Sequence, residues 1–109
     1  PVVDVALPGA GLVEAVAVSV PRALRLPIAT SAAVGASDGV PHAPPVEAME
    51  GFGVLRACAL AGVPAVEVRV ISNEVGEPDR SRWDVAGALE RLEEIVPLAL
   101  AAVERAAAG

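Results

Sequence analysis

Two short stretches of this 109-residue sequence contain side chains suited to binding a small polar molecule. Met49 and Glu50 stand where an extended segment is expected to turn into a helix, and Asn73 follows the alternating stretch VEVRVIS at 66–72. The two carboxylate oxygens of Glu50 can accept hydrogen bonds from vicinal hydroxyls such as those of a ribose, and Met49 offers a soft apolar face to the sugar ring. Asn73 is either a turn residue or a ligand for such a molecule, because asparagine tolerates left-handed geometry and also carries an amide.

Structural roles compete with binding roles at the other polar residues. A carboxylate at Glu50 gains from the helix dipole whether or not it binds a ligand. Glu47 is expected to accept hydrogen bonds from local backbone donors. Glu67 and Arg69 lie two residues apart on one face of an expected strand, where they can pair with each other or with neighbours. His42 stands between prolines without ligands at metal spacing, so the sequence predicts neither a metal site nor a cofactor.

The elements that must position these residues are predicted from apolar periodicity and from the glycines and prolines. The pattern predicts helices at 10–20 and 48–61 and from Asp84 to about Ala107, strands at 26–35 and 65–72, and loops at 1–9, 36–45 and 71–82. Gly62 is placed to cap the second helix and Asp84 to cap the third. Pro97 is expected to kink the third helix, because proline cannot donate to the carbonyl four residues back.

Two glycines in the expected second helix require an explanation. Gly51 and Gly53 each destabilise a helix by about 1 kcal/mol relative to alanine. Close approach of another backbone or of a ligand is the usual reason for a glycine at such a position. We therefore expect the start of this helix to be crowded.

The order of the elements predicts an α/β fold, with parallel strands at 26–35 and 65–72 connected by the helix between them. Ligands of such sheets bind at the carboxyl ends of the strands. Ser72 and Asn73 occupy that place in the sequence. The length allows one domain at most.

Composition argues against several classes of partner. The net charge is −6, with 14 acidic residues against eight arginines and no lysine. No basic stripe is available for a nucleic acid or for an anionic membrane surface. The apolar stretches are too short for a transmembrane helix, and no signal peptide is visible at the start. The single cysteine, Cys58, fits a reducing cytoplasm.

The stretch VEAMEGFGVLRACALAGVPAVEVRVISNEVGEPDRSRWDVAGAL at 46–89 resembles the C-terminal part of the purine nucleoside phosphorylase and nucleosidase superfamily, and within it the futalosine hydrolases. The Met-Glu pair before a small-residue helix resembles the ribose motif of that superfamily, and the strand ending in Ile-Ser-Asn resembles its base-recognition motif. Arg-Trp-Asp at 82–84 favours the futalosine hydrolases, and 26–37 resembles more faintly the strand before the base pocket. The resemblance implies that 1–109 is the C-terminal part of a three-layer phosphorylase/hydrolase-like domain, with a mixed, mainly parallel sheet flanked by helices.

The resemblance also implies a reaction and roles in it. Futalosine hydrolases remove hypoxanthine from futalosine in menaquinone biosynthesis, and members of the superfamily are usually homo-oligomers. Glu50 would bind the ribose hydroxyls, Met49 would pack on the sugar, and Asn73 would hold the purine. Hypoxanthine presents two acceptors, N7 and O6, to the two amide hydrogens of an asparagine, which would stabilise charge on the departing base. The related methylthioadenosine/S-adenosylhomocysteine nucleosidases carry aspartate at this place, which suits adenine.

The sequence departs from the family in ways that keep alternatives open. The N-terminal half of the family's domain has no counterpart here, and 36–45 is short for the family. The isolated chain is therefore expected to be inactive. One alternative is another purine nucleosidase or phosphorylase of the superfamily, with phosphate in place of water. Another is a non-catalytic, truncated nucleoside-binding module.

Overall fold

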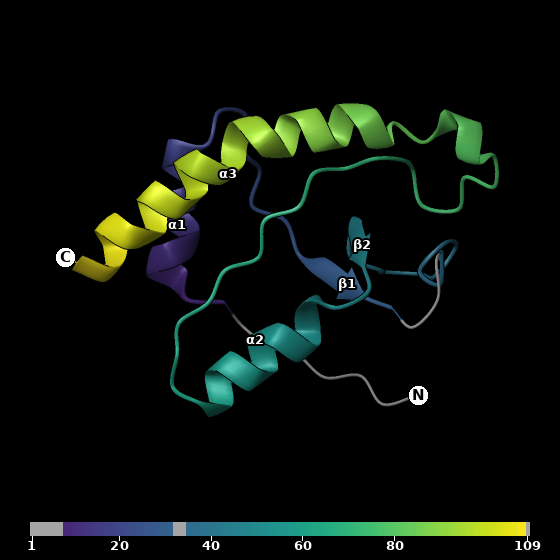
Figure 1. The fold of residues 1–109 in the computed structure, drawn as a ribbon. Helices are drawn as coiled ribbons and strands as arrows, with labels where there is room; N and C mark the ends of the chain where they lie inside the picture. The colour runs from purple at the N-terminus through teal and green to yellow at the C-terminus, as the bar shows by residue number, and fades with distance from the viewer. Residues whose placement is uncertain (1–7, 32–34, 109) are drawn as a thin grey trace.

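The computed structural model describes residues 8–31 and 35–108. Figure 1 shows the described elements in chain order: α1 (Ala10–Ser19), β1 (Ile28–Thr30), β2 (Val46–Ala48), α2 (Gly51–Leu60), the 3₁₀ turn η1 (Arg80–Arg82) and α3 (Val85–Ala108). Most of the loop predicted at 1–9 lies outside the described residues. The described elements mix helices with a small parallel sheet, so the predicted α/β character is confirmed, whereas the three-layer arrangement stays a prediction.

The sheet in the described part of the chain consists of β1 and β2, which pair in parallel with Ile28 opposite Val46 and Thr30 opposite Ala48. The predicted strand at 26–35 is therefore real but only three residues long. The predicted parallel partner was wrong: β1 pairs with β2, which follows the turns of 35–45, and not with 65–72, although α2 does lie between β1 and 65–72 along the chain. The prediction overlooked β2 because Val46-Glu47-Ala48 is too short to show an alternating pattern.

The strand predicted at 65–72 does not form in the structure, although the chain there is extended (Figure 1). A strand requires a hydrogen-bonded neighbour as well as alternating side chains. The alternation itself is present, since Val66 and Val70 pack against the buried core. What is missing among the described residues is a second strand at this place.

The helices follow their predicted boundaries closely. Gly62 follows Ala61, the C-cap residue of α2, and has a φ of 71°, as the cap prediction required. Asp84 accepts a hydrogen bond through Oδ1 from the backbone of Gly87 at 2.9 Å and so caps α3. Pro97 lies inside α3, and the helix axis changes direction about midway along it (Figure 1). The second helix begins at Gly51 and not at Ala48, because Ala48 belongs to β2.

The core lies where α1 crosses α3. Among the residues that the structure describes, its buried hydrophobic members are Val16, Val20, Ile95 and Ala102. Arg105 adds a polar link, since its Nη2 donates to Oγ of Ser19 at 3.1 Å. None of the helices in the described part of the chain has the length and apolar content that crossing a membrane requires.

Candidate functional site

Met49 and Glu50 follow directly on the carboxyl end of β2 and precede the first turn of α2. Thr30, the last residue of β1, accepts a hydrogen bond through Oγ1 from the backbone of Phe52 at 2.9 Å. The backbone of Ser31 donates to the carbonyl of Ala48 at 2.8 Å. The start of α2 is thus attached to the carboxyl ends of both parallel strands, which is where ligands of α/β sheets bind.

Glu50 occupies the N-cap position of α2 but does not cap the helix through its side chain. Its carboxylate forms an ion pair with Nη1 of Arg69, and its side chain is 62% exposed. The side chain of Met49 beside it is also exposed. Both side chains therefore remain accessible to a small molecule.

Arg69 connects Glu50 to the extended segment at 65–72. Its Nε donates to Oε2 of Glu67 at 2.7 Å, so the predicted pairing of these two residues is confirmed. Burial acts to lower the pKa of Arg69, but hydrogen bonds to Glu67 and Glu50 outweigh it and raise that pKa. The guanidinium therefore stays charged and holds the two carboxylates together.

The crowding predicted at the start of α2 is present at one glycine and absent at the other. Gly51 is buried, and a Cβ there would collide with the carboxylate of Glu67. Gly53 is exposed, and apart from its chain neighbours and the backbone of α2 no described atom lies within 4 Å of the place its Cβ would take. The close approach at Gly51 is thus made by a side chain of the extended segment.

Asn73 is half-buried, and both ends of its amide have local partners. Oδ1 accepts from the hydroxyl of Ser72 at 2.6 Å, and Nδ2 donates to the carbonyl of Glu74 at 2.9 Å. The side chain therefore stabilises a turn. Nδ2 carries a second hydrogen, so a ligand with two acceptors would have to displace the carbonyl of Glu74 to engage both.

Glu47 organises the loop beyond β1, and the prediction that it serves as a local acceptor is confirmed. Its carboxylate accepts from the backbone of Gly35 and of Ser37, each at 2.7 Å, and from the hydroxyls of Ser37 at 2.6 Å and Ser31 at 3.3 Å. The hydroxyl of Ser37 is the largest of the causes that lower the pKa of Glu47 below its ordinary value of 4.5. Glu47 is therefore ionised at neutral pH and fixes Gly35 and Ser37 in place.

The loop held by Glu47 lies against the turn that follows Asn73. A Cβ built on Gly35 would contact the backbone of Gly76 at 3.9 Å, and a Cβ built on Gly76 would collide with the carboxylate of Asp38. Gly76 also has a φ of 82°, a conformation that favours glycine. The loop at 35–39 thus supports the turn on which Asn73 is presented.

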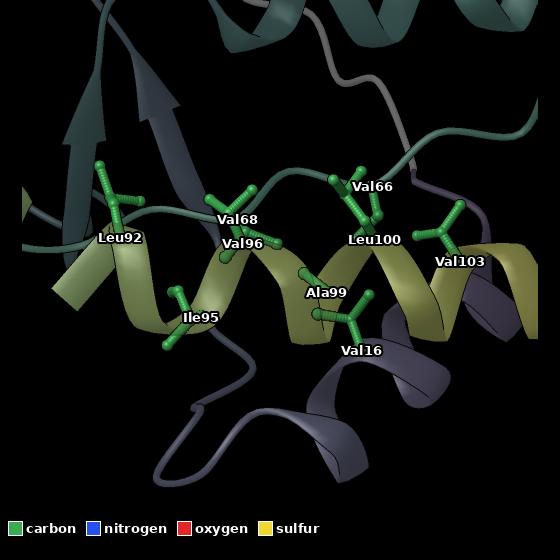
Figure 2. A pocket seen from close by; sticks show the side chains of 9 residues that line it. All are labelled: Val16, Val66, Val68, Leu92, Ile95, Val96, Ala99, Leu100 and Val103. Carbon is green, nitrogen blue, oxygen red and sulfur yellow. The ribbon is translucent and has the colours of Figure 1, made fainter.

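The predicted site residues are therefore on segments that touch one another, although they line neither of two cavities in the described part of the chain. The first cavity, of about 240 Å³, is apolar and lies between the extended segment, α1 and α3 (Figure 2). The second, of about 290 Å³, lies beside the C-terminal half of α2. Met49, Glu50 and Asn73 line neither cavity.

Sequence reasoning did not find the first cavity or the polar link from Thr30 to α2. The cavity has a signal in the sequence, because apolar residues of α3 recur at helical spacing and face the valines of the extended segment. These are Val66 and Val68 on the segment, and Leu92, Ile95, Val96, Ala99, Leu100 and Val103 on α3. The link from Thr30 has no such signal, since it joins residues 22 positions apart.

Comparison with known proteins gives matches over about half of this chain. No protein-family model matches it, and no solved structure matches it significantly. Three curated proteins do match, and all are hydrolases by name. More particularly, each is named futalosine hydrolase: from Acidothermus cellulolyticus, 60% identical over 47 residues; from Streptomyces coelicolor, 52% over 50; and from Thermus thermophilus, 39% over 56.

These matches confirm the resemblance to futalosine hydrolases and define its extent. They cover 43%, 46% and 51% of this chain. They cover only 19%, 21% and 25% of the three relatives. The matched region therefore spans a quarter or less of each relative's length.

Proposed function

We propose that this chain contributes the sugar-binding and base-binding residues of a nucleoside N-ribohydrolase that releases hypoxanthine from futalosine in menaquinone biosynthesis. The observation that carries the proposal is the 60% identity to a futalosine hydrolase over 47 residues. The placement of Glu50 at the carboxyl ends of β1 and β2 supports it. The activation of water is assigned to residues outside this chain.

In the proposed complex Glu50 accepts hydrogen bonds from the two ribose hydroxyls while Met49 packs on the sugar. The ion pair with Arg69 holds the Glu50 carboxylate in place, and the exposure of that side chain leaves room for the hydroxyls. Arg69 is a positioning residue in this arrangement, because it acts on the ligand only through Glu50.

Asn73 is proposed to bind the 6-oxopurine through both hydrogens of Nδ2, one to N7 and one to O6. Negative charge builds on the base as the glycosidic bond breaks, and these donors stabilise it. Binding requires Nδ2 to exchange the carbonyl of Glu74 for the base. We therefore expect a rearrangement of the turn after Asn73 when the purine binds.

Calorimetric titration of the 109-residue chain with hypoxanthine, adenine and inosine tests these roles. We expect Asn73→Ala to weaken hypoxanthine binding by about tenfold, since it removes two hydrogen bonds. Asn73→Asp should shift the preference toward adenine. Glu50→Gln should weaken inosine binding while leaving that of free hypoxanthine unchanged. Equal hypoxanthine affinity in the wild type and Asn73→Ala would reject the role of Asn73.

The reaction itself is tested with the full gene product. We expect it to release hypoxanthine from futalosine at a rate independent of phosphate. A rate that requires phosphate would assign it to the phosphorylases. Assembly as a homo-oligomer and a cytoplasmic location belong to the same proposal.

A second candidate is a non-catalytic nucleoside-binding or structural module. The observation that favours it is the local satisfaction of the Asn73 amide by Ser72 and Glu74. A purely structural module predicts no hypoxanthine binding by the wild type or by any variant. A non-catalytic binding module predicts binding in these titrations but no hypoxanthine release by the full gene product.

A further inference from the structure

The side-chain amide of Asn73 has two edges that recognise different bases. The two hydrogens of Nδ2 together match the N7 and O6 acceptors of a 6-oxopurine. The edge formed by Oδ1 and one Nδ2 hydrogen matches adenine, which presents an acceptor at N7 and a donor at N6. An asparagine at this place therefore does not by itself distinguish hypoxanthine from adenine. The choice depends on which edge of the amide is turned toward the base.

Two contacts fix the orientation of this amide in the structure. The carbonyl of Glu74 can only accept a hydrogen bond, so the atom that faces it at 2.9 Å must be Nδ2. Oδ1 consequently faces the hydroxyl of Ser72, which donates to it at 2.6 Å. The backbone of Ser72 is itself held, because its carbonyl accepts from the backbone of Asp84 at 2.7 Å. The acceptor of the amide is thus occupied by Ser72.

The two contacts respond differently to a bound purine. A base that takes both Nδ2 hydrogens displaces the carbonyl of Glu74 from the amide. That carbonyl keeps a partner, because it also accepts from the backbone of Glu77 at 3.2 Å. The hydroxyl of Ser72 contacts the other end of the amide and is not displaced. Of the two partners that the described residues give this amide, Ser72 is therefore the one that continues to orient it.

We propose that Ser72 is a positioning residue that makes Asn73 selective for 6-oxopurines over 6-aminopurines. Its hydroxyl occupies Oδ1, so this hydrogen bond must break before the Oδ1 edge faces adenine. A flipped amide would donate to Oγ of Ser72 instead, but the hydroxyl hydrogen would then lose its acceptor at a half-buried place. The inference rests on the proposed binding of the purine by Asn73 and adds the residue that determines its selectivity.

The competing explanation is that the hydroxyl of Ser72 only stabilises the turn. A purely structural hydroxyl predicts that its removal weakens the binding of both bases alike, or of neither. The selective role predicts changes that differ between the bases, because only adenine requires the amide to turn.

Calorimetric titration of the 109-residue chain with hypoxanthine and with adenine tests the proposal. Ser72→Ala should bind adenine about tenfold more tightly than the wild type does, since no hydrogen bond has to break when the amide turns. Its affinity for hypoxanthine should not rise. Ser81→Ala is the control, because the Ser81 hydroxyl donates to Oδ1 of Asp79 at 2.6 Å in the same loop and not to Asn73. The control should bind both bases as the wild type does.

A second pair of variants separates the hydroxyl from the packing at this position. Ser72→Thr and Ser72→Val are similar in shape, and both are β-branched, which suits an extended backbone. Only threonine keeps a hydroxyl. We expect Ser72→Thr to retain the preference for hypoxanthine and Ser72→Val to lose it, with circular dichroism confirming that both are folded.

Three outcomes would count against these roles, and they are distinguishable. Equal adenine affinity in Ser72→Ala and the wild type, or parallel losses for both bases, would overturn the selective role of Ser72. Equal preference in the threonine and valine variants would do the same. If the wild type does not bind hypoxanthine, or binds it no better than Asn73→Ala does, the proposed role of Asn73 fails, and the inference about Ser72 fails with it.

Discussion

Gly51 and Gly53 lie in the same turn of α2, yet their surroundings differ completely. The place of a Cβ at Gly51 is occupied by the carboxylate of Glu67, which Arg69 holds. At Gly53 no described atom beyond its chain neighbours and the backbone of α2 lies within 4 Å of the corresponding place. Gly51 therefore allows the extended segment to approach α2. Through Arg69 that approach also fixes Glu50, so the glycine contributes to the candidate site.

Gly51→Ala and Gly53→Ala form a matched pair at the residue scale. We expect Gly53→Ala to stabilise the chain by up to about 1 kcal/mol, the helix propensity gained. Gly51→Ala should destabilise it by about 1 kcal/mol, because Glu67 must move and its charge-assisted hydrogen bond to Arg69 is lost. Urea unfolding followed by circular dichroism measures both. If both substitutions stabilise the chain equally, Glu67 can move away from the added methyl group without any loss of stability.

The Glu47 carboxylate predicts a pH dependence of stability. Its pKa is lowered in the folded chain, chiefly by the hydroxyl of Ser37, so its contribution is fully present above the ordinary value of 4.5 and is lost as the pH falls through the folded pKa. We expect Glu47→Gln to destabilise the chain at pH 7 and to flatten the fall in stability below about pH 5. Urea midpoints between about pH 3 and pH 7 test this. Glu104→Gln, at an exposed position of α3, should leave the slope unchanged.

At the scale of elements, α3 is held at its first turn by Asp84. Oδ1 of Asp84 caps the helix through the backbone of Gly87, and its own backbone donates to the carbonyl of Ser72. The start of α3 is thus attached to the residue that precedes Asn73. If this turn frayed, the backbone next to Asn73 would be held less firmly, and the position of the Asn73 amide would be less well defined.

We expect Asp84→Ala to destabilise the chain by about 1 kcal/mol, the usual effect of removing a helix cap. Asp84→Asn, which keeps a capping oxygen, should retain most of the stability. Thermal unfolding measures the loss, and hydrogen exchange at Asp84 reports whether its bond to Ser72 opens as well. An alanine variant as stable as the asparagine variant would mean that the cap contributes little.

The helices and their caps could be predicted from the sequence because their signals are local. Asp84 and Gly62 lie next to the helix ends they cap, and the ion pair of Glu67 with Arg69 follows from a two-residue spacing. The strand at 65–72 could not be predicted correctly, since a strand depends on a neighbour that local pattern does not reveal. The same holds for the contact of Glu50 with Arg69, which are 19 positions apart and meet only because α2 turns the chain back. Pairing of Met49 and Glu50 with Asn73 in one ligand site stays a prediction.

At the scale of the whole molecule, the core is small compared with the apolar surface around it. In the described part of the chain four hydrophobic residues are buried, all on α1, on α3 or directly after α1. Many larger ones are exposed, among them Leu89 and Leu100 at 58% each. Small domains are marginally stable, at roughly 5–15 kcal/mol. The stability of this chain therefore depends on few residues.

Ile95 and Leu89 on α3 test that dependence, because they are similar in size but differ in burial. Ile95 is 4% exposed and contacts the core, whereas Leu89 is 58% exposed. We expect Ile95→Ala to destabilise the chain by about 2–5 kcal/mol, since the truncation leaves a cavity where α1 and α3 meet. Leu89→Ala should change stability by less than about 0.5 kcal/mol. Both substitutions place alanine in the same helix, and isoleucine and leucine differ in helix propensity by well under about 1 kcal/mol, so the difference in the free energy of unfolding reports mainly burial. If the two variants unfold at the same urea concentration, the contact between α1 and α3 does not hold the molecule together, and the extended segment or the sheet must do so.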